Sequence, residues 1–334
     1  MSMIKRREFL AAALAAAACR SGGGEMPAMK WPAPVYRRQP PASPVHLSGS
    51  LVLRSGSNGS VPPAALKNPM GADMEILEIK FELSGLSKDG TSSVFGGTIG
   101  CELVMGGYKI TNGSIPVWNF GRAENIEGES QVDFSAPQKT YLSYSWRLPR
   151  PLFVPAGAVL VPNFTHFGYV PQAVNVRVGY SARTVFTRPK ALYVPYVAKY
   201  VSKAFNPISA PGTDVSSELD LVNPHPEVFH LQRFTGRILN IDSQGQANEI
   251  FSPGFSARVT DSYGRPIVRS FTPFRSIFGM LTRSWEMDNG TELDPEAYYL
   301  VNLRKSAITG AGETLGAGSS QAFIGMVGWR EMSL

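Results

Sequence analysis

The sequence predicts an all-β protein, in which two tandem β-sandwich units of jelly-roll size follow an extended N-terminal arm. Three observations lead to this prediction. Blocks of sequence recur in the same order within residues 66–334. Apolar and polar residues alternate in short segments, which is typical of strands that bury one face. The 33 glycines and 26 prolines are scattered between those segments, which favours short strands joined by turns over long helices.

The expected division of the chain follows from its length and from the position of the repeat. A chain of 334 residues is long enough for two domains that each bury a core. We expect the arm at residues 1–65, the first jelly roll at 66–190, a linker at 191–222 and the second jelly roll at 223–334.

The arm carries most of the positive charge. Residues 1–50 hold seven basic and two acidic side chains, whereas the whole chain has a net charge of +6. Such an arm suits contact with anionic lipid or with nucleic acid, because the attraction is electrostatic and independent of sequence. The basic residues that we expect to make this contact are Lys5, Arg6, Arg7, Arg20, Arg37 and Arg38.

The start of the arm has two readings. Residues 4–19, IKRREFLAAALAAAAC, resemble a twin-arginine export signal that ends in a lipoprotein-like cleavage site before Cys19. The same run consists of strong helix formers, so a short helix on a flexible tether is the alternative. The apolar run from Phe9 to Ala18 is ten residues long, too short to span a bilayer. From Glu25 to about Pro63 the chain is rich in Pro, Ser and Gly, which indicates an extended segment.

The internal repeat consists of four pairs of blocks. Each unit starts with an Asn-Pro pair, continues with a glycine turn, and ends with two blocks that match at offsets of 139 and 149 residues. The first pair is Asn68-Pro69 with Asn223-Pro224, and the second is residues 105–110 with residues 261–266. In the third pair, Ser145-Trp146, Ala158 and Asn163 match Ser284-Trp285, Ala297 and Asn302. In the fourth, Gln172-Ala173-Val174 and Val178-Gly179-Tyr180 match Gln321-Ala322-Phe323 and Val327-Gly328-Trp329.

Within each unit the local pattern predicts strands. Residues 77–83, 174–178 and 257–259 alternate between apolar and polar side chains. Turn signals stand at Asp89-Gly90, Asn112-Gly113 and Asn289-Gly290. About eight strands fit in each unit, which is the size of a jelly roll. Residues 193–205 of the linker have mixed helical spacing and predict a short helix or an extended crossover, with the domain boundary near residue 210.

The residues that could carry chemistry do not form a catalytic or metal-binding pattern. His46 lies in the arm, His166 in a predicted loop, and His225 and His230 lack the HExxH spacing of a zinc site. Gly179-Tyr180-Ser181-Ala182 lacks the second glycine of a nucleophile elbow. We expect the acidic residues Glu124, Glu127, Glu129 and Asp133 to lie in a solvated loop. We expect Trp118 and Tyr169 to pack in a core rather than to form a surface on which a sugar stacks. The two cysteines, Cys19 and Cys101, form no disulfide framework.

We therefore predict no catalytic, cofactor-binding or metal-binding residue, no cofactor and no enzyme activity. The low content of charged residues, 17%, favours a body whose surface is covered by other copies of the chain.

In its order of strands and turns, the repeat resembles the double jelly-roll major capsid proteins of tailless icosahedral viruses and phages, many of which contain a membrane. The blocks that carry the resemblance are residues 145–163 with 284–302 and residues 172–180 with 321–329. The resemblance covers residues 66–334. It implies a structural virion protein whose homotrimers, with six jelly rolls each, contact neighbouring capsomers and other capsid proteins. It also implies that the arm points inward, toward lipid or genome.

The alternative is a twin-arginine-exported lipoprotein of the bacterial cell envelope, with two β-sandwich modules that bind carbohydrate or another partner. It predicts cleavage before Cys19 and a monomeric body.

Overall fold

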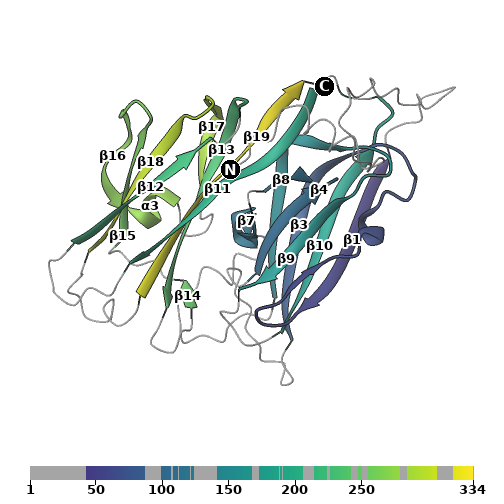
Figure 1. Ribbon diagram of the computed structural model, residues 1–334, viewed down its shortest axis with the longest axis horizontal. Coiled ribbons are helices and arrows are strands. Elements are labelled where there is room, and N and C mark those ends of the chain that lie inside the picture. The colour runs from purple at the N-terminus through teal and green to yellow at the C-terminus, as the bar shows by residue number, and fades with distance from the viewer. Residues whose placement is uncertain are drawn as a thin grey trace, which may run out of the picture.

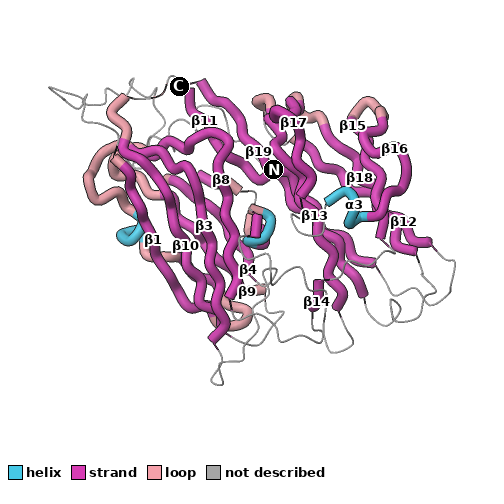
Figure 2. Tube along the Cα trace, turned by 180° about the vertical axis from the view of Figure 1, so that it is seen from behind, coloured by secondary structure: helices cyan, strands magenta, loops and turns pink. Residues whose placement is uncertain are grey.

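The computed structural model shows an all-β chain in which strands form two sandwiches side by side (Figure 1). Helical segments are short, as the view from behind makes clear (Figure 2). The structure describes residues 43–86, 99–106, 108–111, 113–120, 122–123, 141–167, 173–187, 189, 191–205, 214–223, 226–241, 247–249, 255–278, 284–306 and 319–333.

The first sandwich consists of two antiparallel sheets. Its longer sheet, called sheet A here, has the strand order β1-β10-β3-β8-β7, and its shorter sheet, sheet B, has the order β2-β9-β4-β5, with β6 paired to β4. The elements are β1 (Pro44–Leu53), β2 (Asn58–Ser60), η1 (Pro63–Leu66), β3 (Met74–Leu86), β4 (Ile99–Met105), β5 (Tyr108–Lys109), β6 (Ile115–Pro116), η3 (Val117–Asn119), β7 (Arg122–Ala123), β8 (Tyr141–Val154), β9 (Leu160–His166) and β10 (Ala173–Thr184).

The second sandwich is built in the same way. Sheet C has the order β11-β19-β13, to which β14 and β17 add, and sheet D has the order β12-β18-β15-β16. The elements are β11 (Ala191–Phe205), β12 (Asp214–Val222), β13 (Phe229–Ile241), β14 (Ala247–Glu249), β15 (Phe255–Asp261), β16 (Pro266–Pro273), α3 (Phe274–Phe278), β17 (Ser284–Leu293), β18 (Tyr298–Ser306) and β19 (Ser319–Ser333).

The two sandwiches share one topology. The path β1-β10-β3-β8 in sheet A corresponds strand for strand to β11-β19-β13-β17 in sheet C. The path β2-β9-β4-β5 in sheet B corresponds in the same way to β12-β18-β15-β16 in sheet D. Each sandwich thus pairs its first strand with its last and closes two four-strand paths over one core, which is the jelly-roll arrangement. The predicted all-β class with two tandem jelly rolls is confirmed.

The boundary expected between the arm and the first unit is wrong. Residues 44–60 were expected in the arm, but β1 pairs with β10 over its whole length, from Pro44 opposite Arg183 to Leu53 opposite Val174. Val45 and Leu47 of β1 are buried, whereas His46 between them is exposed. The composition of this segment concealed a strand, because pairing with an open sheet edge overrides weak local preference.

The linker expected at residues 191–222 is also wrong, because it forms two strands. β11 pairs with β19, and β12 pairs with β18, so the second sandwich begins at Ala191. Of the two alternatives for residues 193–205, the short helix does not form and the segment is extended, because a neighbouring strand satisfies its backbone.

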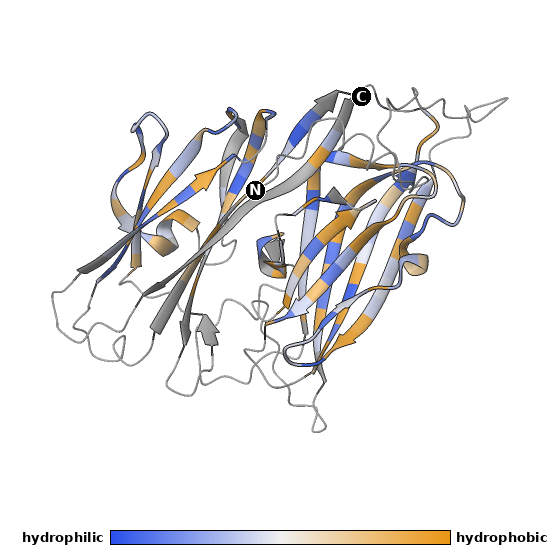
Figure 3. Ribbon diagram, in the orientation of Figure 1, coloured by the Kyte–Doolittle hydropathy of each residue, from blue (hydrophilic) through white to orange (hydrophobic). Residues whose placement is uncertain are grey.

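Strand alternation defines the core of the first sandwich, and Figure 3 shows it as bands of contrasting hydropathy across the strands. Val174, Val176 and Val178 of β10 are buried while Arg177 is exposed, as predicted. The prediction for Leu77 is wrong, because this side chain is exposed, at 37%. The registers of β3 with β10 and with β8 both skip Leu77, so it lies in a β-bulge that shifts the alternation by one residue.

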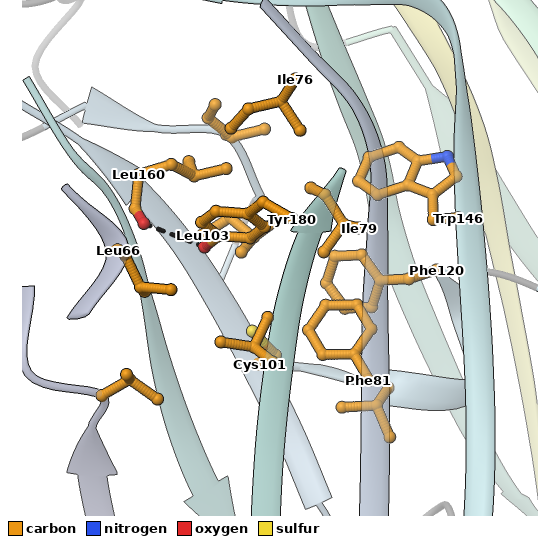
Figure 4. Packing of buried hydrophobic residues seen from close by; sticks show 14 of the residues in the cluster. Leu66, Ile76, Ile79, Phe81, Cys101, Leu103, Phe120, Trp146, Leu160 and Tyr180 are labelled. Atoms are coloured by element: carbon orange, nitrogen blue, oxygen red, sulfur yellow. Dashed lines mark hydrogen bonds between the residues drawn. The ribbon is translucent and has the colours of Figure 1, made fainter. Parts of the chain in front are cut away.

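The centre of this core is aromatic (Figure 4). Phe120 lies between two other rings, with its centroid 5.1 Å from Phe81 and 5.5 Å from Trp146. Cys101 and Tyr180 lie in the same cluster, and the Tyr180 hydroxyl donates a buried hydrogen bond of 2.9 Å to the carbonyl of Leu160. Burial raises the pKa of the Cys101 thiol and of the Tyr180 hydroxyl well above their ordinary values.

The bulge recurs in the second sandwich. In β8 the four residues 148–151 lie between the paired positions Arg147 and Leu152, opposite Leu77. In β17 the four residues 287–290 lie between the paired positions Glu286 and Thr291, opposite Gln232. The two bulges occupy equivalent positions, because residues 287–290 follow residues 148–151 by the same offset of 139 that the sequence repeat shows. The turn predicted at Asn289-Gly290 is therefore wrong, because this pair belongs to a bulge within β17.

Candidate functional site at the junction of the sandwiches

Two of the four histidines, His46 and His166, occupy different environments from those expected. His46 is exposed on β1 rather than in the arm, and His166 is the last residue of β9 and buried, not part of a loop. His230 lies on β13, while His225 lies outside the described residues. Within the part of the chain that the structure describes, no three His, Cys, Asp or Glu residues are grouped so as to hold a metal ion.

The segment Gly179–Ala182 lies in the middle of β10 and pairs with both β1 and β3. A nucleophile elbow needs a sharp turn from strand to helix, whereas this segment is a strand paired on both sides. The acidic residues 124, 127, 129 and 133 and Tyr169 lie outside the described residues, as does the side chain of Trp118. Among the described segments, no helix is long and apolar enough to cross a membrane.

The two sandwiches contact each other through apolar, polar and aromatic side chains, and this contact is the candidate functional surface. β11 and β19 of sheet C lie next to β8 of the first sandwich (Figure 1). On β19, Ala322, Ile324 and Met326 point into the core of the second sandwich. Phe323 and Val327 point the other way and pack, together with Val194 of β11, against the core of the first. The outer face of sheet C is therefore an apolar contact surface.

A polar contact crosses the same junction. The guanidinium of Arg233 on β13 donates from Nη2 to the carbonyl of Phe120, directly after η3 of the first sandwich. Arg233 is only 4% exposed. A buried charge that reaches from one unit to the other fixes their relative position, since its loss leaves a buried acceptor to be satisfied elsewhere.

The bulge of β8 adds an aromatic contact. Its Arg150 places the guanidinium carbon 5.3 Å from the ring centroid of Tyr193 on β11 and 5.4 Å from that of Trp329 on β19. The two rings meet edge to face at 5.7 Å. At an exposed site each cation–π contact stabilises by about 0.5–1 kcal/mol.

Trp329 also stacks on a histidine. The imidazole of His230 lies parallel to the indole, with centroids 3.8 Å apart and an interplanar angle of 8°. The His230 Nδ1 atom is 3.8 Å from Glu292 Oε1 on β17. On the neighbouring residue, Arg330 Nη1 donates to Glu227 Oε2 at 3.3 Å, and both of these side chains are nearly buried.

The sequence did not predict this junction, because the repeat was aligned three residues out of register in the last strand. Tyr180 pairs with Ile79, which in turn pairs with Trp146. In the second sandwich Trp285 pairs with Phe234, which pairs with Met326 and not with Trp329. Tyr180 therefore corresponds to Met326, and the sequence match of Tyr180 with Trp329 is wrong in space. The local similarity of two glycine-aromatic pairs concealed the shift.

Comparison with known proteins gives matches only among solved structures. No protein-family model matches the sequence, and no curated protein sequence matches it. The structure is similar to the major capsid protein P2 of bacteriophage PM2, with a TM-score of 0.41 and 9% identity over 86% of this chain and 98% of that chain. It is similar to the mavirus major capsid protein, with a TM-score of 0.37 and 8% identity over 85% and 90% of the two chains.

A chain of the Sputnik virophage gives a TM-score of 0.35 and 8% identity, over 95% of this chain and 93% of that one. The double jelly-roll fold predicted from the sequence is shown by the strand order of the two sandwiches.

Proposed function

We propose that this chain is a structural virion protein: a major capsid protein whose homotrimers, each with six jelly rolls, tile an icosahedral shell. The observation that supports the proposal is the packing of two units of one topology against each other, with β8 and η3 of the first unit on the outer face of sheet C of the second. Such a contact joins two different surfaces, so its repetition between chains generates a ring when the rotation from one chain to the next closes.

The role proposed is mechanical rather than catalytic. A trimer of doubled units presents six similar sides, so one protein can fill a hexagonal lattice while its two halves make unequal contacts. Neighbouring capsomers and other capsid proteins are the partners that such sides would meet, and the virion is the proposed location.

We propose that the N-terminal arm contacts membrane lipid or genome inside the shell, through Lys5, Arg6, Arg7, Arg20, Arg37 and Arg38. Most of this segment lies outside the described residues. Because β1 starts at Pro44, removal of residues 1–42 leaves both sandwiches complete. We expect the truncated protein to keep its oligomeric state and to lose salt-sensitive binding to anionic vesicles or DNA in co-sedimentation. Unchanged binding would contradict a role for the arm.

The experiment that tests the function is intact mass spectrometry with light scattering on protein expressed from residue 1. We expect an uncut chain of 36.2 kDa that associates in threes. A single chain that begins at a lipidated Cys19 would contradict the capsid proposal and favour the exported lipoprotein suggested by residues 4–19.

A further inference from the structure

The outer faces of sheets A and C have equivalent backbone positions but different side chains. The face of sheet A carries exposed ion pairs, whereas the face of sheet C packs apolar residues against the first sandwich. Taking Ile79 as equivalent to Phe234 and Tyr180 as equivalent to Met326, each outward residue of one sheet has a counterpart in the other. Phe323, Val327 and Trp329 of β19 correspond to Arg177, Ser181 and Arg183 of β10, and Arg233 and Thr235 of β13 correspond to Glu78 and Lys80 of β3.

On sheet A these positions form a lattice of ion pairs. Arg183 Nη2 lies 2.7 Å from Glu75 Oε2, and Arg177 Nη1 lies 3.6 Å from Glu82 Oε2. The side chains of Arg177 and Arg183 are 56% and 48% exposed. Exposed pairs of this kind contribute little to stability, so folding does not require all of them.

The difference follows from when each face is covered. The outer face of sheet C meets its neighbour in the same chain, so it is covered on folding and can be apolar. A face that meets another chain must stay soluble until that chain arrives, because a large exposed apolar patch promotes indiscriminate association. Charged side chains on the outer face of sheet A satisfy this requirement and also select a partner by charge.

We propose that the outer face of sheet A is the docking surface for a second copy of this chain, which presents β17 and α3. This inference rests on the proposed function and names the surfaces that join the chains. β8 and η3 of the first sandwich cover sheet C, and the corresponding elements of the second sandwich are β17 and α3. The bulge at residues 287–290 then takes the place of the bulge at 148–151.

The repeat assigns a particular pair of positions across the new contact. Within one chain Arg150, the third residue of its bulge, lies over Trp329. Asn289 is the third residue of the equivalent bulge, and Arg183 is the equivalent of Trp329. Asn289 of one copy therefore lies close to Arg183 of the next, and three such contacts close a ring.

The test is a crosslink in the full chain. Arg183→Cys and Asn289→Cys are introduced together with Cys19→Ala, while the remaining thiol, Cys101, is buried. After treatment with a short bismaleimide, we expect bands of two and three linked chains on a denaturing gel. The control combines Arg183→Cys with Ser216→Cys, an exposed position on β12 at the opposite edge of sheet D from β16, and stays a single chain.

A second variant tests the same surface without chemistry. Ser181→Trp places a large ring on the outer face of sheet A, where Ser181 corresponds to the junction residue Val327. We expect association of the chains to weaken at least tenfold by light scattering, with an unchanged circular dichroism spectrum. Ser216→Trp, at the exposed position on β12, serves as the control and associates like the natural chain.

The outcomes separate this inference from the function on which it rests. If the natural chain forms trimers but the cysteine pair gives no crosslink and Ser181→Trp associates normally, the docking surface is wrong and the capsid proposal stands. If the natural chain is a monomer, both fall together.

Discussion

Asn68 and Asn223 each precede a proline, and each donates a side-chain hydrogen bond to the carbonyl four residues later, Ala72 or Glu227. The Asn223 amide also reaches the carbonyls of Leu293 and Asp294, at 3.0 and 3.2 Å. Both asparagines are buried, so their amides satisfy backbone groups that solvent does not reach. A sequence match of two residues thus reflects a shared structural device at the entry to β3 and β13.

These contacts give the first stability prediction. We expect Asn68→Ala and Asn223→Ala each to lower the free energy of unfolding by about 1–3 kcal/mol, because buried carbonyls lose their donor. The loss at Asn223 should be larger, since its amide serves three carbonyls. The measurement is urea unfolding followed by circular dichroism. Asn175→Ala, at a partly exposed site on β10, is the control, and an equal loss there would contradict the role of the buried amides.

Burial of Cys101 and Tyr180 makes stability depend on alkaline pH. Their pKa values are raised in the folded protein, whereas in the unfolded chain they ionise near 9.0 and 10.0. Above pH 9 the unfolded chain therefore releases protons that the folded chain retains, and the free energy of unfolding decreases by up to about 1.4 kcal/mol per pH unit for each group. The stabilisation is fully present below that pH and is lost as pH rises.

The check is urea unfolding from about pH 8 to about pH 11. We expect stability to fall across this window, and to fall less steeply between pH 9 and pH 10 in Cys101→Ala, which lacks the first group. The same slope in both proteins would show that Cys101 already ionises in the folded state.

At the scale of elements, the two cores fill one position in different ways. Phe81 faces the core from β3, and its counterpart on β13 is Gly236. α3 occupies the space that this glycine leaves: a Cβ atom on Gly236 would lie 2.6 Å from the Phe278 ring and 2.8 Å from Phe274. The aromatic ring thus comes from the strand in the first sandwich and from a short helix in the second.

Gly236→Ala tests this exchange. We expect a loss of about 1–3 kcal/mol in unfolding free energy, because the added methyl group displaces α3 from sheet C. Gly179→Ala is the matched control, since the nearest atom to its Cβ would be 3.9 Å away. Differential scanning calorimetry of both variants gives the comparison, and equal melting temperatures would refute the packing described for α3.

The sequence predicted the elements whose alternation is regular and missed those defined by their partners. Residues 174–178 and 257–259 alternate and form β10 and β15. β1 and β11 do not stand out in composition, and they exist because they complete sheets beside β10 and β19. Bulges are the second cause of error: Leu77 was placed inside and Asn289-Gly290 in a turn, because one extra residue changes the period of a strand.

The candidate site could not be predicted from the sequence, because the sequence does not reveal the pairing register of the last strand, β19. The sequence indicated that residues 321–329 repeat residues 172–180, but a shift of three residues decides whether Trp329 lies in a core or at a junction. Only strand pairing reveals that shift. Arg150 and Arg233, which reach across the junction, belong to no motif, and no local pattern distinguishes them from surface arginines.

At the scale of the whole molecule, the chain is a pair of equivalent units in one fixed contact. The junction uses Phe323, Val327 and Arg233 of the second sandwich against the first. The same backbone surface on the first sandwich carries exposed ion pairs. We propose that this exposed surface makes the equivalent contact with a second copy, so that three chains would form a ring of six units.

The measurement that tests the proposed ring of three chains most directly is electron microscopy of the purified full chain, with class averages of single particles. We expect rings of three chains with six lobes of similar size, in which alternate lobes differ slightly because the two sandwiches differ. Particles with two lobes at every concentration would contradict it, since the exposed face of sheet A would then have no second copy to meet.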